Sequence, residues 1–237
     1  MIDYKIIDNY DRSYKELYNI IVKIGAKKCT IGFPTGNTAI PMYAYLTKNP
    51  NHQILWKNIT IFMLDVLFPQ LANDPLSYYT YIKTNLLNKI SLPLDNFHIL
   101  DSACDNPNEE CQKYEAEIRK AGGLDLVILG LGQNGHIAFN EPGTNPDLST
   151  HKTALTNETI NINSSDNKNY PTMGLTMGIK TIMSAKKIIL LAQGENKARA
   201  VFNSIKKTIN PLCPASFLQN HPDCTYFLDT NAAKLLI

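Results

Sequence analysis

The sequence predicts an α/β protein built on a doubly wound, mostly parallel sheet with helices on both faces. Apolar strand-like runs alternate with amphipathic helix-like segments along nearly all of the 237 residues, which is the pattern of βαβ units. The run Leu124–Leu129 is almost entirely apolar, as expected of a strand buried on both faces of a parallel sheet. Polar, glycine-containing motifs follow several such runs, where ligands bind in sheets of this type. We expect one domain over residues 1–237.

The first half of the chain supplies most of the predicted helices. Tyr14, Leu17, Tyr18 and Ile21 recur at helical spacing and predict a helix within Tyr10–Lys27. The same reading of periodicity and turn residues gives, in order, a strand Cys29–Phe33, a helix Thr38–Thr47, a strand Ile59–Leu64, a helix Pro75–Asn88, a short strand near Phe97–Leu100 and a helix Asn108–Lys120.

The second half continues the alternation after one irregular segment. The predicted elements are the strand Leu124–Leu129, a strand Lys186–Ala192, a helix Lys197–Lys207 and a last strand Thr225–Leu228. Asn157–Tyr170 breaks the pattern because it is rich in asparagine and poor in core-forming residues. Two interpretations stay open for it, a loop or lid beside the functional site and a disordered surface insertion.

Composition narrows the class of protein and its partners. The formal net charge of +2 gives no strong field, so we expect neither nucleic acid nor a membrane as a partner. The five cysteines are an odd number without metal-ligand spacing, which indicates free thiols rather than disulfides or a metal site. No signal-type apolar segment opens the chain. We therefore expect a cytoplasmic protein.

The most informative motif is Gly130–Gly143, directly after the strand Leu124–Leu129. It carries an amide, an imidazole and a carboxylate in Asn134, His136 and Glu141. An imidazole changes charge near neutral pH and transfers protons, and a nearby carboxylate orients the ring. A structural histidine is the alternative, but the surrounding glycines and polar residues favour a functional one.

A second motif, Gly32–Thr38, joins a predicted strand to a predicted helix. Backbone amides at a helix start, with the hydroxyls of Thr35 and Thr38 beside Gly36 and Asn37, form a cradle for an anion. The motif is neither a Walker A loop nor a dinucleotide fingerprint. Taken alone, it slightly favours an ordinary strand-to-helix turn.

Two further residues occupy equivalent positions. Asp65 directly follows the strand Ile59–Leu64, where a partly buried carboxylate serves as a general base or simply caps a turn. Lys197 follows the strand Lys186–Ala192 and is either a phosphate ligand or a solvated surface lysine. All four motifs come just after predicted parallel strands, so we expect them to meet in one crevice.

These residues resemble the family of glucosamine-6-phosphate deaminases (isomerising) and the related 6-phosphogluconolactonases, over nearly the whole chain. The string His136–Gly143 is specific for the amino-sugar branch. The matching segments are Pro34–Thr38, Asp65, Ser77–Tyr78, Gly135–Gly143, Gly194–Ala198 and Pro214–His221. The resemblance implies a modified Rossmann-like fold and a 2-amino-2-deoxyhexose 6-phosphate as substrate.

The resemblance also implies roles for the candidate residues. His136, oriented by Glu141 and Asn134, would open the sugar ring, and Asp65 would move the C2 proton to C1 before ammonia leaves. Phosphate would lie on Thr35–Thr38, with Lys197 opposite. Such proton transfers need positioned acids and bases only, so we expect no metal and no organic cofactor.

Three departures from the family pattern bear on this expectation. Val66 and Leu67 follow Asp65, where members often have a glutamate and an aromatic residue, and Asn134 stands where many have an aspartate. The phosphate-binding arginine of many members has no counterpart near Ser165, and Lys168 or Lys180 are the candidate substitutes. The short, arginine-free loop is more similar to the galactosamine-6-phosphate branch.

Two other functions remain as alternatives to the deaminase/isomerase. One is a hydrolase of the 6-phosphogluconolactonase type, which the Phe139–Pro142 string disfavours. The other is a non-catalytic sugar-phosphate sensor. The expected partner is a small-molecule sugar phosphate, and the chain is expected to be a monomer or a small homo-oligomer.

Overall fold

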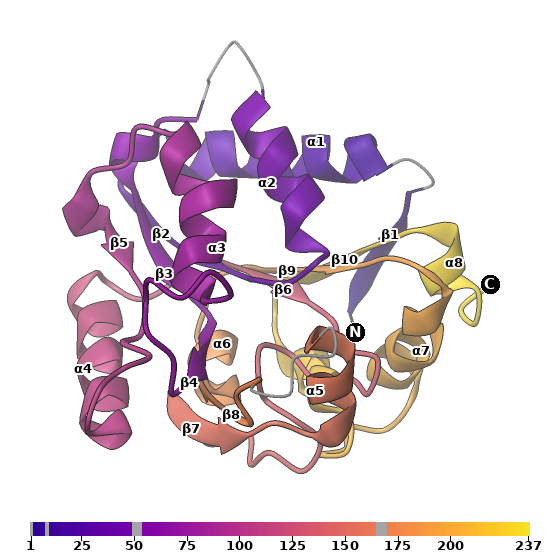
Figure 1. Cartoon of the computed structure of the whole chain (residues 1–237). Coiled ribbons are helices and arrows are strands. Elements are labelled where there is room, and N and C mark those ends of the chain that lie inside the picture. The colour runs from indigo at the N-terminus through magenta and orange to yellow at the C-terminus, as the bar shows by residue number, and fades with distance from the viewer. Residues whose placement is uncertain (1, 8–9, 49–53, 165–169) are drawn as a thin grey trace.

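The protein is built around a seven-stranded parallel sheet (Figure 1), seen in a computed structural model that describes residues 2–7, 10–48, 54–164 and 170–237. The pairings within this sheet are all parallel. In spatial order the strands are β1 (Asp3–Ile6), β10 (Cys224–Leu228), β9 (Ile188–Ala192), β6 (Leu126–Gly130), β2 (Cys29–Phe33), β3 (Ile59–Met63) and β5 (Phe97–His98). The predicted fold class is therefore confirmed.

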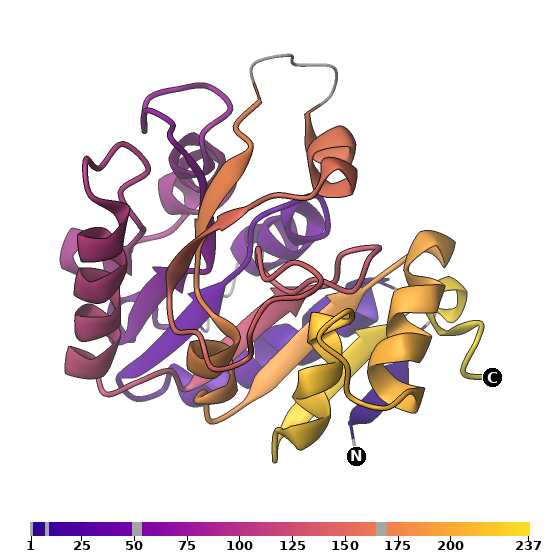
Figure 2. The same ribbon diagram turned by 90° about the horizontal axis from the view of Figure 1, so that it is seen from below.

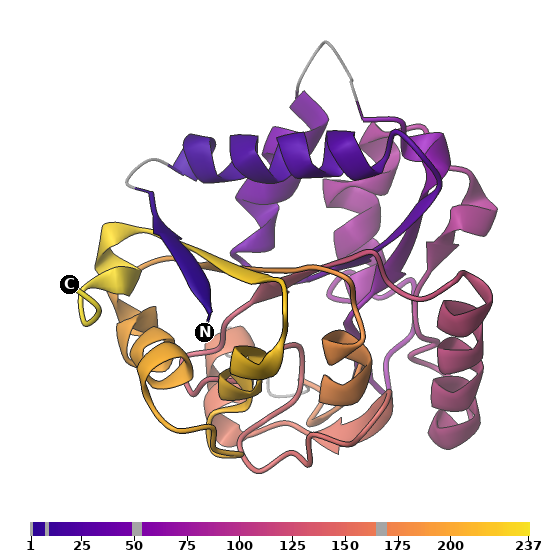
Figure 3. The ribbon, with the colours of Figure 1, turned by 180° about the vertical axis from the view of Figure 1, so that it is seen from behind.

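Helices cover both faces of the sheet (Figures 1 and 3). One face carries α1 (Tyr10–Ile24), α2 (Ala39–Lys48) and α3 (Tyr78–Asn85). The other side carries α4 (Pro107–Lys120), α5 (Asn157–Asn163), α6 (Ile179–Met183) and α7 (Ala198–Lys206), and α8 (Thr230–Ala233) lies near its edge. Single turns of 3-10 helix occur at Trp56–Asn58, Leu87–Lys89, Leu94–Asn96 and Glu195–Lys197, with a longer one at Pro214–Asn220.

Two apolar cores lie on the two faces of the sheet. Successive residues of a strand contribute their side chains to one core and then to the other. Ile61 and Met63 of β3 pack with α1, α2 and α3, whereas Phe62 between them packs on the opposite side with α4. The central strands are buried on both faces, which explains why they are continuous apolar runs. Burial of this kind is the main stabilising term of the fold.

A second, antiparallel sheet of three strands was not predicted. It consists of β4 (Asp65–Phe68), β8 (Met173–Thr176) and β7 (His151–Ala154), in that order. Figure 2 shows it standing beside the main sheet. β4 follows β3 after one residue, Leu64, so the two strands form one apolar run in which the change of pairing partner leaves no sequence signal.

The irregular segment Asn157–Tyr170 is partly helical, so its interpretation as a loop was wrong for residues 157–163. Thr156 caps α5 because its hydroxyl accepts a hydrogen bond from the amide of Thr159. Residues 165–169, with Ser165 and Lys168, lie outside the described residues. The helix predicted over Pro75–Asn88 is shorter, since α3 begins only after the Ser77 N-cap.

The sheet order creates a crevice at its centre. From β2 the chain builds outward through β3 to β5, and it then returns to place β6 on the other side of β2. Loops leaving the carboxyl ends of β2 and β6 therefore diverge, which is where open α/β sheets bind ligands. No helix of the described residues is long and apolar enough to cross a membrane.

Candidate active site

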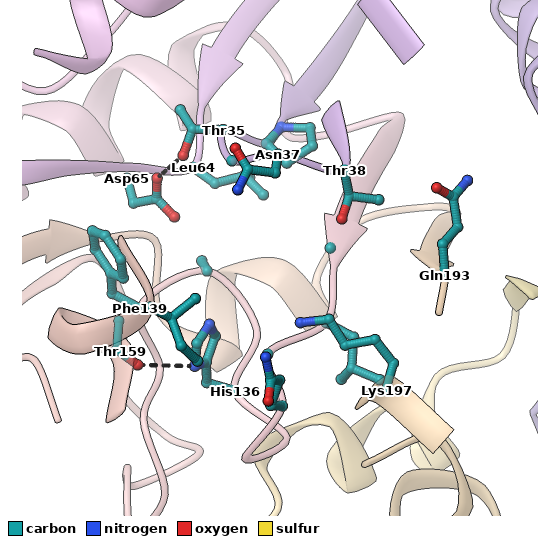
Figure 4. A pocket seen from close by; sticks show the side chains of 18 of the residues that line it. Thr35, Asn37, Thr38, Leu64, Asp65, His136, Phe139, Thr159, Gln193 and Lys197 are labelled. Carbon is teal, nitrogen blue, oxygen red and sulfur yellow. Dashed lines mark hydrogen bonds between the residues drawn. The ribbon is translucent and has the colours of Figure 1, made fainter. Parts of the chain in front are cut away.

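A cavity of about 300 Å³ lies at this crevice and collects residues from all four predicted motifs (Figure 4). Of the nine predicted site residues, seven line it: Thr35, Gly36, Asn37, Thr38, Asp65, His136 and Lys197. The remaining two, Asn134 and Glu141, lie behind His136 and contact it or its loop. The predicted convergence of the four motifs is confirmed.

Asp65 lies on one wall of the cavity as the first residue of β4. Its side chain is buried, with 5% of the residue exposed, and Oδ1 accepts a hydrogen bond of 3.0 Å from Thr35 Oγ1. Burial raises the pKa of Asp65 to about 6, although the Thr35 hydrogen bond and the charge of His136 act in the opposite direction. A carboxylate with such a pKa binds a proton readily and still ionises near neutral pH.

His136 lies on the opposite wall and is held by a network of polar side chains. Its Nδ1 lies 3.5 Å from Glu141 Oε2 and 3.4 Å from Thr159 Oγ1. Figure 4 shows the other ring nitrogen on the side of the cavity that faces Asp65. The ring is therefore oriented through one nitrogen and free to exchange a proton with a ligand through the other.

Glu141 is the anionic partner of this network. Its Oε2 accepts 2.9 Å from Asn134 Nδ2 and 3.3 Å from Thr156 Oγ1. Burial acts to raise the pKa of Glu141, but the hydrogen bonds and the charge of His136 outweigh it and lower the pKa to about 2. Glu141 is thus ionised at neutral pH and presents its negative charge to Nδ1 of His136.

Tight backbone geometry brings His136 into place. A Cβ atom on Gly132 would lie 2.4 Å from the His136 ring, so only glycine fits there. Gly135 has a φ of +88°, a conformation that glycine adopts without strain. Ala138 has a φ of 49° without being glycine, which costs on the order of 1–2 kcal/mol. At Ala138 the loop is therefore held in a conformation that alanine does not favour.

The far end of the cavity is polar and cationic. Thr38, Gln193 and Lys197 line this end, and Figure 4 shows the Lys197 amino group pointing into the cavity. Burial lowers the pKa of Lys197, and Glu158 partly offsets this effect. Gly36–Thr38 lead directly into α2, so the amino end of that helix also faces this region. This arrangement suits a phosphate group.

The described lining of the cavity contains none of the chain's three arginines, Arg12, Arg119 and Arg199. Lys180, one candidate substitute for the family's arginine, lies in a separate groove with Asp147 and Phe217, so that assignment was wrong. Ser165 and the other candidate, Lys168, lie outside the described residues. Lys197 is the lysine of the described residues that lines the cavity.

Sequence reasoning missed several lining residues. Phe139 and Gln133 belong to the central motif, and Gln193 follows a strand end, so position alone could have indicated them. Thr159 and Ile162 come from α5, within the segment Asn157–Tyr170 that one interpretation of the sequence placed beside the site, although neither residue was singled out. The other missed residues are Pro34, Leu64, Tyr78, Gly130, Leu131, Gly132, Ala138 and Asn196.

The fold and the cavity define an α/β protein with an acid–base site at the carboxyl edge of a parallel sheet. Residues 12–227 match the family model of glucosamine-6-phosphate isomerases/6-phosphogluconolactonase. The chain belongs to this family, and its relatives in it are enzymes.

Individual relatives support the assignment over nearly the full length. The glucosamine-6-phosphate deaminase of Alkaliphilus oremlandii is 40% identical over 235 residues, covering 97% of this chain and 98% of its own. That of Clostridium acetobutylicum is 39% identical, covering 97% and 98%. A solved structure of a monomeric glucosamine-6-phosphate deaminase has a TM-score of 0.90 at 32% identity, with 99% and 100% coverage. The 6-phosphogluconolactonase of Thermotoga maritima shares the fold, with a TM-score of 0.79 at 23% identity over 97% and 100%.

Proposed function

We propose that this protein is a glucosamine-6-phosphate deaminase, which converts the amino sugar to a ketohexose 6-phosphate and ammonia. The observation that carries the proposal is the pairing across one cavity of Asp65 and His136, with Lys197 and the Thr35–Thr38 turn at the cavity's other end. Relatives that carry this name are about 40% identical over nearly the whole chain. The cavity, about 300 Å³, is of the size that holds a small ligand.

The reaction begins with opening of the sugar ring. His136, held beside ionised Glu141, takes the proton of the C1 hydroxyl and delivers a proton to the ring oxygen, so the ring opens without net change in the charge of His136. Asn134 holds Glu141 Oε2 and also accepts from the His136 amide at 3.1 Å, so it fixes both members of the pair. The product of this step is the open-chain aldehyde with its amine still on C2.

Asp65 carries out the second step. As a carboxylate it removes the C2 proton, giving an enolamine, and it returns the proton to C1. Water then adds at C2 of the resulting imine and ammonia leaves, so the net reaction consumes one water. Burial strengthens the base, because it raises the pKa of Asp65 to about 6. Proton transfers of this kind require no metal and no organic cofactor.

Lys197 and the turn before α2 would bind the 6-phosphate. The single lysine gives one charge-assisted contact, and the amides and hydroxyls of Gly36–Thr38 supply further donors. With the phosphate at this end, we propose that C1 and C2 lie between Asp65 and His136, which line the same cavity. We further propose that the protein acts as a single domain and a monomer, as the deaminase of known structure is described.

The substrate epimer is glucosamine rather than galactosamine in this proposal, because the named relatives act on glucosamine 6-phosphate. The short loop that resembles the galactosamine-6-phosphate branch makes the C4 epimer the natural competitor. We also propose a cytoplasmic location, which the five free cysteines support.

An ammonia-release assay with both epimeric amino-sugar phosphates tests the proposal. We expect ammonia and fructose 6-phosphate from glucosamine 6-phosphate, and a lower kcat/KM with galactosamine 6-phosphate. Hydrolysis of 6-phosphogluconolactone without ammonia release would instead identify a lactonase. Thermal stabilisation by either sugar phosphate without turnover would identify a sensor.

A further inference from the structure

Residues 176 and 177 connect the two walls of the cavity, although neither lines it and no functional motif contains them. On the Asp65 side, Thr176 is the register partner of Asp65 in the antiparallel pairing of β8 with β4. The next residue, Met177, donates its amide to Leu64 O at 2.7 Å, directly before Asp65. The position of Asp65 is therefore tied to the backbone of this short segment.

The same two residues also hold the His136 loop. Thr176 Oγ1 accepts a hydrogen bond of 2.9 Å from the amide of Phe139, and Met177 O accepts one of 2.9 Å from Asn140 Nδ2. Thr176, Met177 and Asn140 are fully buried. These contacts reach the loop three and four residues after His136.

The loop depends on such external support. Ala138, between His136 and Phe139, has a left-handed backbone with a φ of 49°, which an alanine does not adopt by preference. Residues in such conformations persist where surrounding contacts over-determine them. The Phe139 ring also packs so closely on Gly174 of β8 that a Cβ there would lie 2.6 Å from it. The loop is thus fastened to β8 and to Met177 by the two residues that directly follow the strained Ala138.

We propose that Thr176 is a positioning residue that sets the separation and mutual orientation of Asp65 and His136. The inference rests on the proposed function, and it concerns how His136 and Asp65 are held at the correct distance and orientation for that reaction. The hydroxyl is the essential group, because it is the acceptor for the Phe139 amide. A valine has nearly the same shape but leaves that amide buried without a partner, which favours displacement of the loop.

The test compares Thr176→Val with Thr176→Ser, which keeps the acceptor, in the ammonia-release assay with glucosamine 6-phosphate. We expect Thr176→Val to lower kcat by about 10- to 100-fold, because misplacement by about 1 Å has an effect of that order. KM should change less than about threefold, since Lys197 and the Thr35–Thr38 turn are untouched, and Thr176→Ser should recover most of kcat.

Thr181→Val is the matched control. Thr181 is also a buried threonine, and its hydroxyl donates to Glu115 Oε1 at 2.6 Å, away from the cavity. This variant should lower the melting temperature and leave kcat within about twofold. Equal losses of kcat in the two valine variants would overturn the proposal, because they would indicate general destabilisation.

Hydrogen–deuterium exchange of the peptide spanning residues 136–141 gives a readout that does not need turnover. The Phe139 amide should exchange faster in Thr176→Val than in the wild type or in Thr176→Ser. Unchanged exchange together with a wild-type kcat would refute the positioning role. If the wild-type protein itself released no ammonia, the proposed function would fail, while faster exchange in Thr176→Val would still support the contact between Thr176 and the loop.

Discussion

The two carboxylates of the site have nearly equal exposure and opposite protonation behaviour. Asp65 and Glu141 are 5% and 4% exposed. Yet the pKa of Asp65 is raised to about 6, whereas that of Glu141 is lowered to about 2. Burial acts to raise both pKa values, so the difference comes from the partners. Asp65 has one hydroxyl donor, and Glu141 has His136 and several hydrogen-bond donors.

The comparison assigns a role to each carboxylate. A weakly solvated carboxylate with a raised pKa accepts a proton near neutral pH, which suits the base that moves hydrogen from C2 to C1. A carboxylate that stays ionised suits the stabilisation of a protonated His136. Pairs of titratable groups whose environments push their pKa values apart are typical of acid–base sites.

The largest effect is expected from removal of the base. Asp65→Asn should lower kcat by about 10³- to 10⁴-fold, because it removes the group that transfers the C2 proton. Binding of the product, fructose 6-phosphate, through its phosphate should persist, since Lys197 and the Thr35–Thr38 turn are unchanged. Steady-state kinetics and calorimetric titration measure the two quantities. Wild-type turnover in this variant would exclude Asp65 as the base.

His136→Gln probes the other wall. We expect kcat to fall by about 100-fold with the closed-ring sugar, because ring opening loses its general acid. The kcat measured with an open-chain substrate analogue should fall much less, since Asp65 remains intact. Comparison of the two substrates in the same assay gives the measurement. Equal losses with both substrates would contradict the assignment of His136 to ring opening.

The two carboxylates should also affect folding stability in opposite directions. The folded-state pKa of Asp65 lies above its ordinary value of 3.8. Its ionisation therefore destabilises the folded protein progressively as the pH rises from about 4 to about 6. Asp65→Asn should then raise the free energy of unfolding at pH 8 by up to about 3 kcal/mol, at 1.36 kcal/mol per pKa unit. The gain should disappear below about pH 4.

Glu141→Gln should do the reverse. The folded-state pKa of Glu141 is lowered from 4.5 to about 2, so its contribution to stability is present above pH 4.5 and is lost as the pH falls through about 2. Denaturant unfolding at pH 8 should show a loss of about 1–3 kcal/mol, in contrast to the gain in Asp65→Asn. Stability changes of the same sign in both variants would contradict the opposite pKa shifts of Asp65 and Glu141.

The smallest expected effect concerns the influence of Thr35 on the pKa of Asp65. The Thr35 hydroxyl stabilises the charged carboxylate of Asp65, so Thr35→Val should raise the pKa of Asp65 further above about 6. The acid limb of the kcat/KM profile should move to higher pH by up to about one unit. Thr35→Ser retains the donor and should leave the limb in place. A shift to lower pH in Thr35→Val would contradict the geometry.

The main sheet could be predicted from the sequence because burial on both faces produces long apolar runs. Cys29–Phe33 was predicted with the observed bounds, and Ile59–Leu64 differs by one residue. The antiparallel sheet could not, since β7 and β8 have four residues each and β4 follows β3 after one residue. The edge strand β1 was missed because its exposed residues give no clear alternation.

More of the candidate site than of the surrounding fold could be predicted from the sequence. Thr35, Asp65, His136 and Lys197 follow four parallel strands, and the geometry of such a sheet brings their ends together. Thr159 and Thr176 are close to the site only through tertiary contacts of α5 and β8. One interpretation of the sequence placed the segment of Thr159 beside the site, but no pattern singled out Thr159 or Thr176 themselves, so the structure was needed to identify them.

The central claim is that Asp65 and His136 act on one sugar from opposite walls of the same cavity. It is tested most directly by turnover of glucosamine 6-phosphate that carries deuterium at C2, with NMR detection of that deuterium at C1 of the ketose product. The account predicts C1 deuterium in the wild type, none in Asp65→Asn, and slower incorporation with the closed-ring sugar in His136→Gln. Deuterium incorporation by Asp65→Asn at the wild-type rate would contradict it.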